Sequence, residues 1–529
     1  MFLEKKEVGG EHVQRGSICC GCVDIRLFVL IIALMFSGCT SPMHEIREPS
    51  LSQRIAPVAE SRGLFGEKVP AQKRSEAALS DPHLLTRTEN PIVSPGTWPG
   101  NEKSGSPIRQ NAPLLPGKTL SLQQSIFYAK KHNPRLRVLR ERVTQARAGK
   151  QIAFAAFLPE AIVSYRALWG TDKFVLPTAP TLLGNMAFGE MADNFQSAEL
   201  NLQWVVWDFG RTPGLYNQAR AARDIAELQY DRGVQTVVFN TKAAYLNLLK
   251  KKAMVRVAGE AVARADSLLR DARNYRAQGT AVQNDVLQAE LLMAEMQLAL
   301  VSARTARTVA LAGLNRVMGF QVSSHTEIAD VKGKPVFSLS LESCLRQAVE
   351  SRDEFRSVLK AISSSQWGLA ASKARFLPRI IAGGTGAHHG GNPSGDAYFL
   401  AGGVKIELSL FEGTRRYGDL EKSRSEVREA MARAEEIADT IAFEVIVAYA
   451  GIAEAREGIS YSRTAVERGE ENLRVLRHMM ERGDATATDV IDAEWALLRA
   501  NEHYYTALYQ YRIALAQLDY AVGTSGLES

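Results

Sequence analysis

The sequence predicts an α+β membrane protein made of two tandem structural repeats, each containing long helices and short strands. Three observations support this prediction. The C-terminal three-quarters of the chain contains one pattern twice, two very long stretches lack proline, and short segments alternate apolar with polar residues. A repeat of this length is one structural unit used twice, so each copy must build an equivalent part of one object.

The repeat is clearest in two phrases whose positions differ by 204 residues. The first phrase covers residues 276–290 and the second covers residues 481–494. Corresponding residues include Gly279 and Gly483, Asp285 and Asp489, Glu290 and Glu494, Tyr245 and Tyr449, and Phe239 and Phe443. Each phrase has the form Gly-x(5)-Asp-Val-[Leu/Ile]-x-Ala-Glu, which suits a glycine turn followed by the start of a helix.

Each repeat begins with a shorter common pattern at a shift of 219 residues. Leu-Ser-Leu occurs at 120–122 and 339–341, and Phe-Leu-Pro occurs at 157–159 and 376–378. About 35 residues of helical pattern lie between them, and the prolines end these helices. A helix is expected to start near Asn133-Pro134, where the second repeat has Arg352-Asp353 instead.

Strands are predicted after each Phe-Leu-Pro, because the apolar period changes to two. Segments of roughly ten residues with this alternation suit strands with lipid on one side and water on the other, although a soluble hairpin would alternate in the same way. The apolar positions are Ala161, Val163, Tyr165, Ala167 and Trp169, then Leu200, Leu202, Trp204 and Val206, and in the second repeat Val404, Ile406, Leu408 and Leu410. The first hairpin has the longer loop, and the second has a glycine-rich loop expected to contain His388-His389.

Very long helices are predicted where proline is missing, between Pro213 and Pro335 and after Pro393. The stretch from Pro213 to Gly279 would form a rod of roughly 100 Å, and a second helix would return to Gly319. The return helices carry apolar residues at steps of three and four, which is a coiled-coil seam. These positions are Val286, Ala289, Met293, Met296 and Leu300, repeated as Val490, Ala493, Leu497, Ala500 and Tyr504.

Four strands in one chain cannot close a barrel, and an open sheet edge is not tolerated in lipid. Several chains must therefore contribute to one barrel, and three chains would supply twelve strands.

The net charge of +6 is small for 529 residues and does not suggest a nucleic-acid partner. No residue pattern indicates a catalytic pair, a cofactor or a metal site, so we expect no enzyme activity.

The N-terminus indicates export. Basic residues precede the apolar run 27–36, which is too short to span a bilayer comfortably, and Phe36-Ser-Gly-Cys39 resembles a lipoprotein cleavage site. We expect Cys39 to be lipidated, the alternative being an ordinary cleaved signal. Cys19, Cys20 and Cys22 would be removed with the signal, which leaves Cys344 as a buried thiol. The predicted boundaries are 1–38 for the signal peptide, 39–118 for a flexible tether, 119–335 and 336–524 for the repeats, and 525–529 for a C-terminal tail.

These residues and their order resemble the TolC family of outer-membrane efflux channels over about residues 119–524. The resemblance rests on the two glycine phrases, the two Leu-Pro helix ends, Trp207-Asp-Phe-Gly-Arg211, and Leu314-x(4)-Gly319 with Leu518-x(4)-Gly523. It implies a homotrimer with a 12-stranded β-barrel in outer-membrane lipid and a periplasmic helical tunnel. It also implies a periplasmic adaptor protein and an inner-membrane pump of RND or ABC type as partners.

The resemblance further implies functional residues at the starts of the return helices. Asp489 and Asp492 match acidic residues that form rings at the periplasmic constriction, and their like charges would raise some pKa values in a trimer. The alternative for Asp489 is a helix-capping role. The expected adaptor contacts are the turns at Gly279, Thr280, Gly483 and Asp484. The cargo stays open, and a periplasmic coiled-coil scaffold is the competing interpretation.

Overall fold

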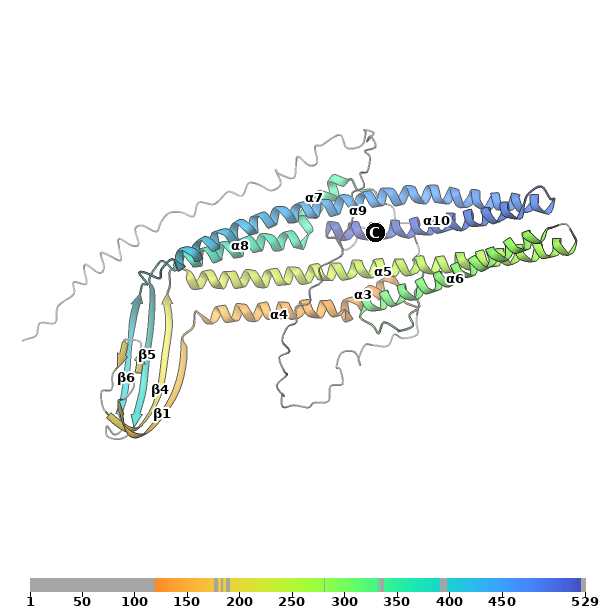
Figure 1. Cartoon of the computed structure of the whole chain (residues 1–529). Helices are drawn as coiled ribbons and strands as arrows, with labels where there is room; N and C mark the ends of the chain where they lie inside the picture. Colours follow the sequence, from red (N-terminus) through yellow and green to blue (C-terminus); the bar gives the residue numbers. More distant parts are fainter. Residues whose placement is uncertain are drawn as a thin grey trace, which may run out of the picture. The chain divides into compact units, whose positions relative to one another are not determined.

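The computed structural model describes residues 119–524 except 176–178, 182–183, 187–190, 280, 332, 334–336 and 391–396 (Figure 1). For residues 170–193 it describes the backbone alone. The predictions for the signal peptide, Cys39, the tether and the tail lie outside the described residues, and so does Thr280. The fold that follows is that of the two repeats.

The two repeats contain the same helices in the same order. The first repeat consists of α3 (Leu122–His132), α4 (Pro134–Ala155), β1 (Glu160–Val175), β4 (Met191–Trp207), α5 (Arg211–Ala277) and α6 (Gln283–Met318). The second consists of α7 (Leu341–Ser351), α8 (Asp353–Ala374), β5 (Arg379–Gly390), β6 (Ala397–Glu407), α9 (Arg415–Glu481) and α10 (Ala487–Val522). Both long helices have 67 residues and both return helices have 36, so the predicted shifts of 219 and 204 hold for whole helices.

Local sequence explains where these helices begin and end. Ser121 and Ser340 cap α3 and α7 by accepting a backbone N–H with their hydroxyl groups. The side chain of Asn133 accepts from the N–H of Arg135 at 2.8 Å, directly before the proline that starts α4. The return helices end at Gly319 and Gly523, both with a left-handed φ near 80°.

The strands form one antiparallel sheet in the order β1-β4-β5-β6. The contact between β4 and β5 joins the two repeats, from Gln196 opposite Gly390 to Trp207 opposite Ile380. The strands β1 and β6 are the edges of this sheet. Each hairpin therefore belongs to one repeat, and the sheet as a whole needs both.

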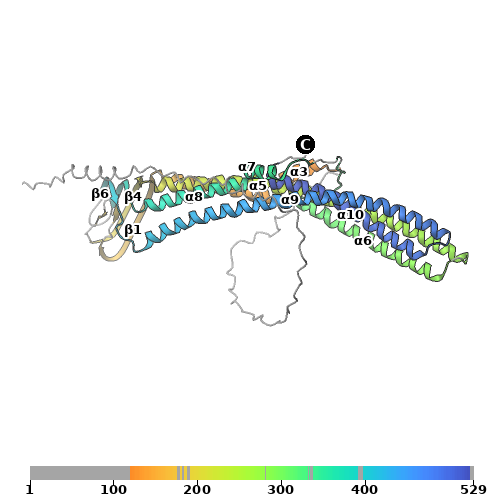
Figure 2. The same cartoon turned by 90° about the horizontal axis from the view of Figure 1, so that it is seen from above.

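The helices form two layers that follow one another along the length of the long helices α5 and α9, which belong to both. Next to the sheet the order is α4-α5-α8-α9, and in the distal half it is α6-α5-α10-α9 (Figures 1 and 2). A buried core in the distal half includes Ala265, Ala289, Met296, Val490 and Leu497, which confirms most of the predicted coiled-coil seam. The other core surrounds Tyr245, whose hydroxyl donates to the carbonyl of Ala329 at 2.6 Å.

The structure corrects three strand predictions. β1 and β4 have 16 and 17 residues rather than about ten, and a short hairpin of β2 (Ala179–Thr181) and β3 (Gly184–Met186) lies between them. β6 ends at Glu407, so Leu408 and Leu410 lie beyond it. His388 and His389 belong to β5 and not to a loop, because the nearby glycines are strand residues in a close-packed sheet. A Cβ on Gly384 would lie 3.1 Å from the carbonyl oxygen of Ala401.

Candidate functional site

The two faces of the sheet differ in chemistry. The register places Val163 opposite Leu200, and both side chains are exposed on the outer face together with Leu400. On the inner face Ser197 donates to Glu199 at 2.7 Å, and Thr385 donates to Asn201 at 2.8 Å. An apolar outer face with a hydrogen-bonded polar inner face is the pattern of a strand that separates lipid from a water-filled interior.

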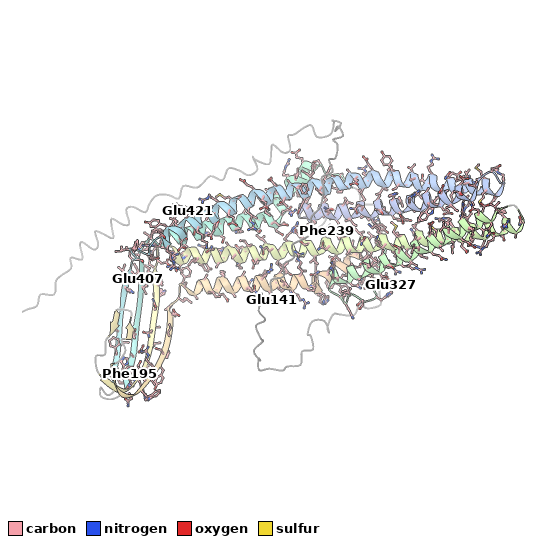
Figure 3. All side chains as sticks on the ribbon, viewed as in Figure 1. Glu141, Phe195, Phe239, Glu327, Glu407 and Glu421 are labelled. Carbon is pink, nitrogen blue, oxygen red and sulfur yellow. The ribbon has the colours of Figure 1, made fainter. Side chains whose placement is uncertain are left out.

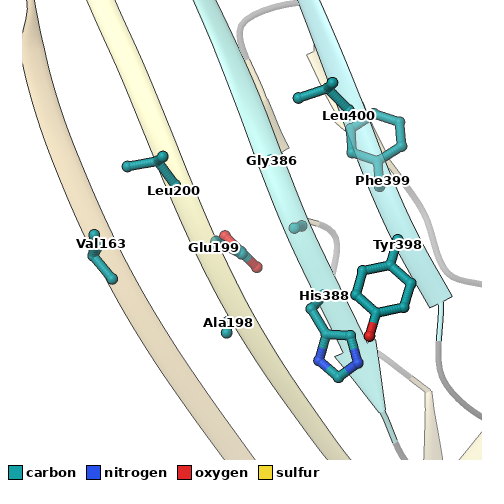
Figure 4. Close-up of a pocket in the computed structure, with 10 residues that line it drawn as sticks. Val163, Ala198, Glu199, Leu200, Gly386, His388, Tyr398, Phe399 and Leu400 are labelled. Carbon is teal, nitrogen blue, oxygen red and sulfur yellow. The ribbon is translucent and has the colours of Figure 1, made fainter.

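A groove of about 560 Å³ lies on the sheet where β5 carries Gly386 (Figure 4). Leu200 of β4 and Leu400 of β6 border it, and the ring of His388 lies 4.6 Å from that of Tyr398 between ring centroids. The groove exists because Gly386 has no side chain to fill the space between Leu200 and Leu400 on the neighbouring strands. It belongs to the apolar face and not to the polar interior.

The edge strands leave the sheet incomplete. β6 stops at Glu407 opposite Arg379, the first residue of β5, so the apolar residues that follow have no strand to pair with inside the chain. In β4, which has a neighbour on each side, pairing continues to Trp207. An unpaired edge is costly in lipid, so β6 and β1 need strands from other copies.

The start of each return helix has an acidic cap. Asp489 accepts from the N–H of Thr486 at 2.9 Å and from its hydroxyl at 2.6 Å. In the first repeat Asp285 accepts from the N–H of Val282 at 3.1 Å. The hydrogen bonds from Thr486 lower the pKa of the Asp489 carboxyl below its ordinary value. Asp489 therefore caps α10 in the single chain. The raised carboxyl pKa values expected from a ring of acids in three chains stay a prediction.

Asp492 and its counterpart Gln288 make the two repeats different at this end. Asp492 is exposed one helical turn after Asp489, so both carboxylates lie on the accessible surface of α10. Gln288 of α6 instead accepts from the hydroxyl of Thr488 at 2.8 Å. This hydrogen bond links the two return helices close to their first turns.

The turns between the long and the return helices are tight. Gly279 and Gly483 have φ values of 78° and 79°, which other residues rarely adopt. The N–H of Asp484 donates to the carbonyl of Met479 at 2.8 Å, and its carboxylate lies 3.4 Å from Arg482. The second turn therefore presents a short tip at the end of its helical hairpin.

A cluster of buried charges was missed by sequence reasoning. Arg352 is 3 % exposed, and its guanidinium bonds to Glu354 at 2.9 Å and to Glu444 at 2.5 Å. Arg232 of α5 pairs with the same Glu354 and lies 3.6 Å from the ring centroid of Tyr520. The available signal was the replacement of Asn133-Pro134 by Arg352-Asp353 in the second repeat. This cluster fixes α5, α8, α9 and the end of α10 to one another.

Neither a metal centre nor a reactive thiol is found in the part of the chain that the structure describes. No cluster of three His, Cys, Asp or Glu residues there could hold a metal ion. Cys344 is buried and free, as predicted, and burial raises the pKa of its thiol. One described helix, α6, is long and apolar enough to cross a membrane by length and composition.

The fold and this site define a class of membrane-channel subunits that complete a pore only as an assembly and extend it with helical hairpins. Residues 126–320 and 344–524 match the family described as Outer membrane efflux protein, and the chain belongs to that family. The two matched ranges correspond to the two repeats.

Individual relatives are distant in sequence. The chain is 21% identical over 381 residues to the Outer membrane efflux protein BepC of Brucella suis, covering 71% of this chain and 79% of that protein. It is 24% identical over 420 residues to Protein CyaE of Bordetella pertussis, covering 77% and 85%. The crystal structure of the Campylobacter jejuni CmeC outer membrane channel matches with a TM-score of 0.68 at 17% identity, covering 76% and 85%.

Family membership settles the class of function. The chain is an outer-membrane channel protein of an efflux or secretion system, located in the outer membrane and extending into the periplasm. The family consists of channel proteins rather than enzymes. Its members are trimers that work with a periplasmic adaptor and an inner-membrane pump. The competing scaffold interpretation leaves the apolar outer face of the sheet unexplained.

Proposed function

We propose that three copies of this chain form a passive conduit that catalyses no reaction and binds an adaptor protein at its periplasmic end. The observation that carries the proposal is the sheet with one apolar face, one polar face and two open edges. Twelve strands close the barrel, and the helices α5, α6, α9 and α10 extend its interior away from the membrane.

The periplasmic constriction is proposed to lie at the first turns of α10. Three copies of Asp492 would place a ring of carboxylates around a narrow opening, and a ring of fixed negative charge favours cations. The second repeat alone carries this acid, because the first has Gln288 at the same position. Asp489 contributes its charge next to the ring while it caps the helix.

The adaptor is proposed to bind the helical tips at Gly279, Thr280, Gly483 and Asp484. These tips are the ends of the two hairpins and lie far from the sheet (Figure 1). Asp484 and Arg482 are exposed there and offer polar contacts to a partner. Cys39 is proposed to carry a lipid anchor that holds the chain at the outer membrane in addition to the barrel.

The conduit function is tested by reconstitution of the purified full chain into planar lipid bilayers. Stable ion-conducting steps of uniform size are expected. In a separate experiment with the adaptor present, Asp484→Cys should crosslink to the adaptor protein. A strain without the gene should lose resistance to exported compounds and regain it with the intact gene. Lack of conductance together with unchanged resistance would contradict the proposal.

A further inference from the structure

Inside one chain, the long helix α5 of the first repeat packs against α8 and α10 of the second repeat. We call this contact the internal seam. The helices α4, α6 and α9 lie at the edges of the two layers (Figures 1 and 2). Since the repeats have equal helices, a further contact of the same kind would join α9 of one copy to α4 and α6 of another. Each residue of the internal seam thus has a counterpart, at a shift of 204 for α5, α6, α9 and α10 and of 219 for α4 and α8.

The ion pair between Arg232 and Glu354 has a counterpart with reversed charges. Arg232 lies on α5 and pairs with Glu354 on α8. The counterpart of Arg232 on α9 is Glu436, and the counterpart of Glu354 on α4 is Arg135. Both side chains are exposed in the single chain. Their charges remain complementary although each has changed sign.

A second ion pair of the internal seam shows the same reversal. Lys360 of α8 lies 3.6 Å from Asp224 of α5. The counterparts are Glu141 on α4, labelled in Figure 3, and Arg428 on α9. In the single chain Arg428 donates to Glu421 of its own helix at 2.9 Å. That pair is exposed, and such pairs contribute little, so Arg428 can exchange it at small cost.

A third ion pair, in the distal half, has a counterpart in which each residue keeps the sign of its charge. Arg264 of α5 donates to Glu494 of α10 at 2.8 Å, and the Glu494 side chain is 3 % exposed. The counterparts are Arg468 on α9 and Glu290 on α6, whose side chain is 44 % exposed and bonds only on one side, to Arg273 of α5. The second side of Glu290 is the side that Arg468 of another copy would occupy.

Glycines give evidence that does not depend on charge. A Cβ on Gly214 of α5 would lie 3.0 Å from the Cβ of Ala371, and a Cβ on Gly368 of α8 would lie 3.1 Å from Gln218. The glycines are therefore required by close helix packing in the internal seam. Their counterparts are also glycines, Gly418 of α9 and Gly149 of α4, yet in the single chain nothing lies within 4 Å of a Cβ at either position.

Apolar side chains lie exposed on the edge helices at positions that are covered in the internal seam. Ile152 of α4 is 75 % exposed, whereas its counterpart Ala371 is 4 % exposed. Phe443 of α9 is 67 % exposed, whereas its counterpart Phe239 stacks on the ring of Tyr520 at 5.2 Å between centroids. Covering these side chains would add the hydrophobic contribution that the ion pairs alone do not supply.

The correspondence is not complete. Lys242 of α5 pairs with Asp519 of α10 at 3.2 Å, and the counterparts of these residues are Ile446 and Asn315. This position of a second seam would have no ion pair. The three complementary pairs and the two glycines are the features that the two seams would share.

We propose that α9 of one copy and α4 and α6 of the next form an external seam that repeats the internal seam, with Glu436–Arg135, Arg428–Glu141 and Arg468–Glu290 as its ion pairs. The inference rests on the proposed trimeric channel and identifies the surface that closes it. Reversed charges make the two seams different.

The test is a charge-swap series in the full-length protein, purified in detergent and analysed by native mass spectrometry. Glu436→Arg and Arg135→Glu should each lower the trimer fraction at fixed concentration by at least about tenfold, because every seam then contains a like-charge pair. The double variant should return to within about twofold of the wild type, since each seam regains a complementary pair. Arg433→Glu is the matched control, because its counterpart Gln229 stays exposed although α5 has neighbours on both sides.

A covalent readout covers the case in which a charge variant fails to fold. Arg428→Cys combined with Glu141→Cys should be joined between chains by a short bis-thiol crosslinker, because the side chains of their counterparts Asp224 and Lys360 lie 3.6 Å apart in the internal seam. Each single cysteine variant serves as the control. If the wild type is trimeric while the charge variants remain trimeric and no crosslink forms between chains, the external seam is wrong. If the wild type is not trimeric, the proposed channel itself is contradicted.

Discussion

Asn133 and Arg352 occupy the same position in the two repeats and donate to the same carbonyl position. The amide of Asn133 donates to the carbonyl oxygen of Val317 at 2.7 Å, and the guanidinium of Arg352 donates to that of Ala521 at 3.0 Å. Both carbonyls lie in the last turn of a return helix, where helical partners are missing. Arg352 adds two ion pairs that an asparagine could not make. The second repeat therefore keeps the contact with the end of its return helix and gains the buried charge cluster, although Arg352 does not cap α8 with its side chain as Asn133 caps α4.

We expect Arg352→Met to destabilise the contact between α8 and α9 by about 3 kcal/mol, because it leaves Glu354 and Glu444 without their shared cation. Hydrogen exchange of the α8 amide groups measures the local opening free energy. Arg352→Asn should cost less, because asparagine can still donate to Ala521 as Asn133 does to Val317. Equal protection in all three proteins would show that the cluster does not hold the helices together.

The same cluster predicts weaker packing in acid. Burial alone would raise the pKa of Glu354, but hydrogen bonds from Arg352 and the charges of Arg232 and Arg352 hold it below its ordinary value. The resulting stability is present above about pH 4.3, the value for an unfolded chain, and is lost as the pH falls through the folded pKa. Burial and Asp231 raise the pKa of Asp353, so its protonation favours folding as the pH falls and offsets part of the loss.

The measurement for this pH dependence is hydrogen exchange of α8 between pH 6 and pH 3, corrected for intrinsic rates. Wild-type protection should fall below about pH 4.3, whereas protection in Glu354→Gln should start lower and not fall, because the protonation of Asp353 that remains is stabilising. A wild-type profile that stays flat to pH 3 is incompatible with the prediction.

Substitution of Gly418 should weaken the trimer, whereas substitution of its counterpart Gly214 should destabilise the single chain. Gly418→Leu places a better helix former at an open position, so the helix content of the single chain should stay the same or rise. The trimer should become less stable, because the external seam has no room for the side chain. Gly214→Leu should damage the chain itself, since a Cβ there already meets Ala371 at 3.0 Å. Circular dichroism and native mass spectrometry distinguish the two, and an intact Gly418→Leu trimer would argue against the seam.

The acidic ring should control ion selectivity. Asp492→Asn should lower the cation preference of single channels in planar bilayers, because three negative charges leave the constriction. Asp489→Asn should lower it as well and also weaken the cap that Thr486 completes. Asp285→Asn is the matched control, since it weakens a comparable cap in the first repeat without touching the proposed ring. Unchanged selectivity in the Asp492 variant would remove that residue from the constriction.

The repeat could be predicted from sequence because helix length depends on local signals. Proline-free stretches, glycine turns and capping residues such as Ser121 give the same starts and ends in both copies. The strand faces also followed from alternation, since Val163 and Leu200 lie on the outer face as predicted. These features need only neighbouring residues in one chain.

Other features depend on contacts between distant segments and could not be predicted in that way. The end of β6 at Glu407 reflects the start of its neighbour at Arg379 and a missing strand on the other side. His388-His389 resembled a loop because glycines surround it, yet those glycines fit the tight approach of β5 and β6. The pairing of Arg232 with Glu354 requires the packing of two repeats, which no local pattern reports.

The central claim is that one chain supplies a third of a closed channel. Native mass spectrometry of the full-length protein, extracted from the outer membrane in mild detergent, tests it most directly. We expect a dominant species with the mass of three chains at protein concentrations well above the dissociation constant of the trimer. A dominant single chain or dimer, still able to conduct ions in a bilayer, would contradict it.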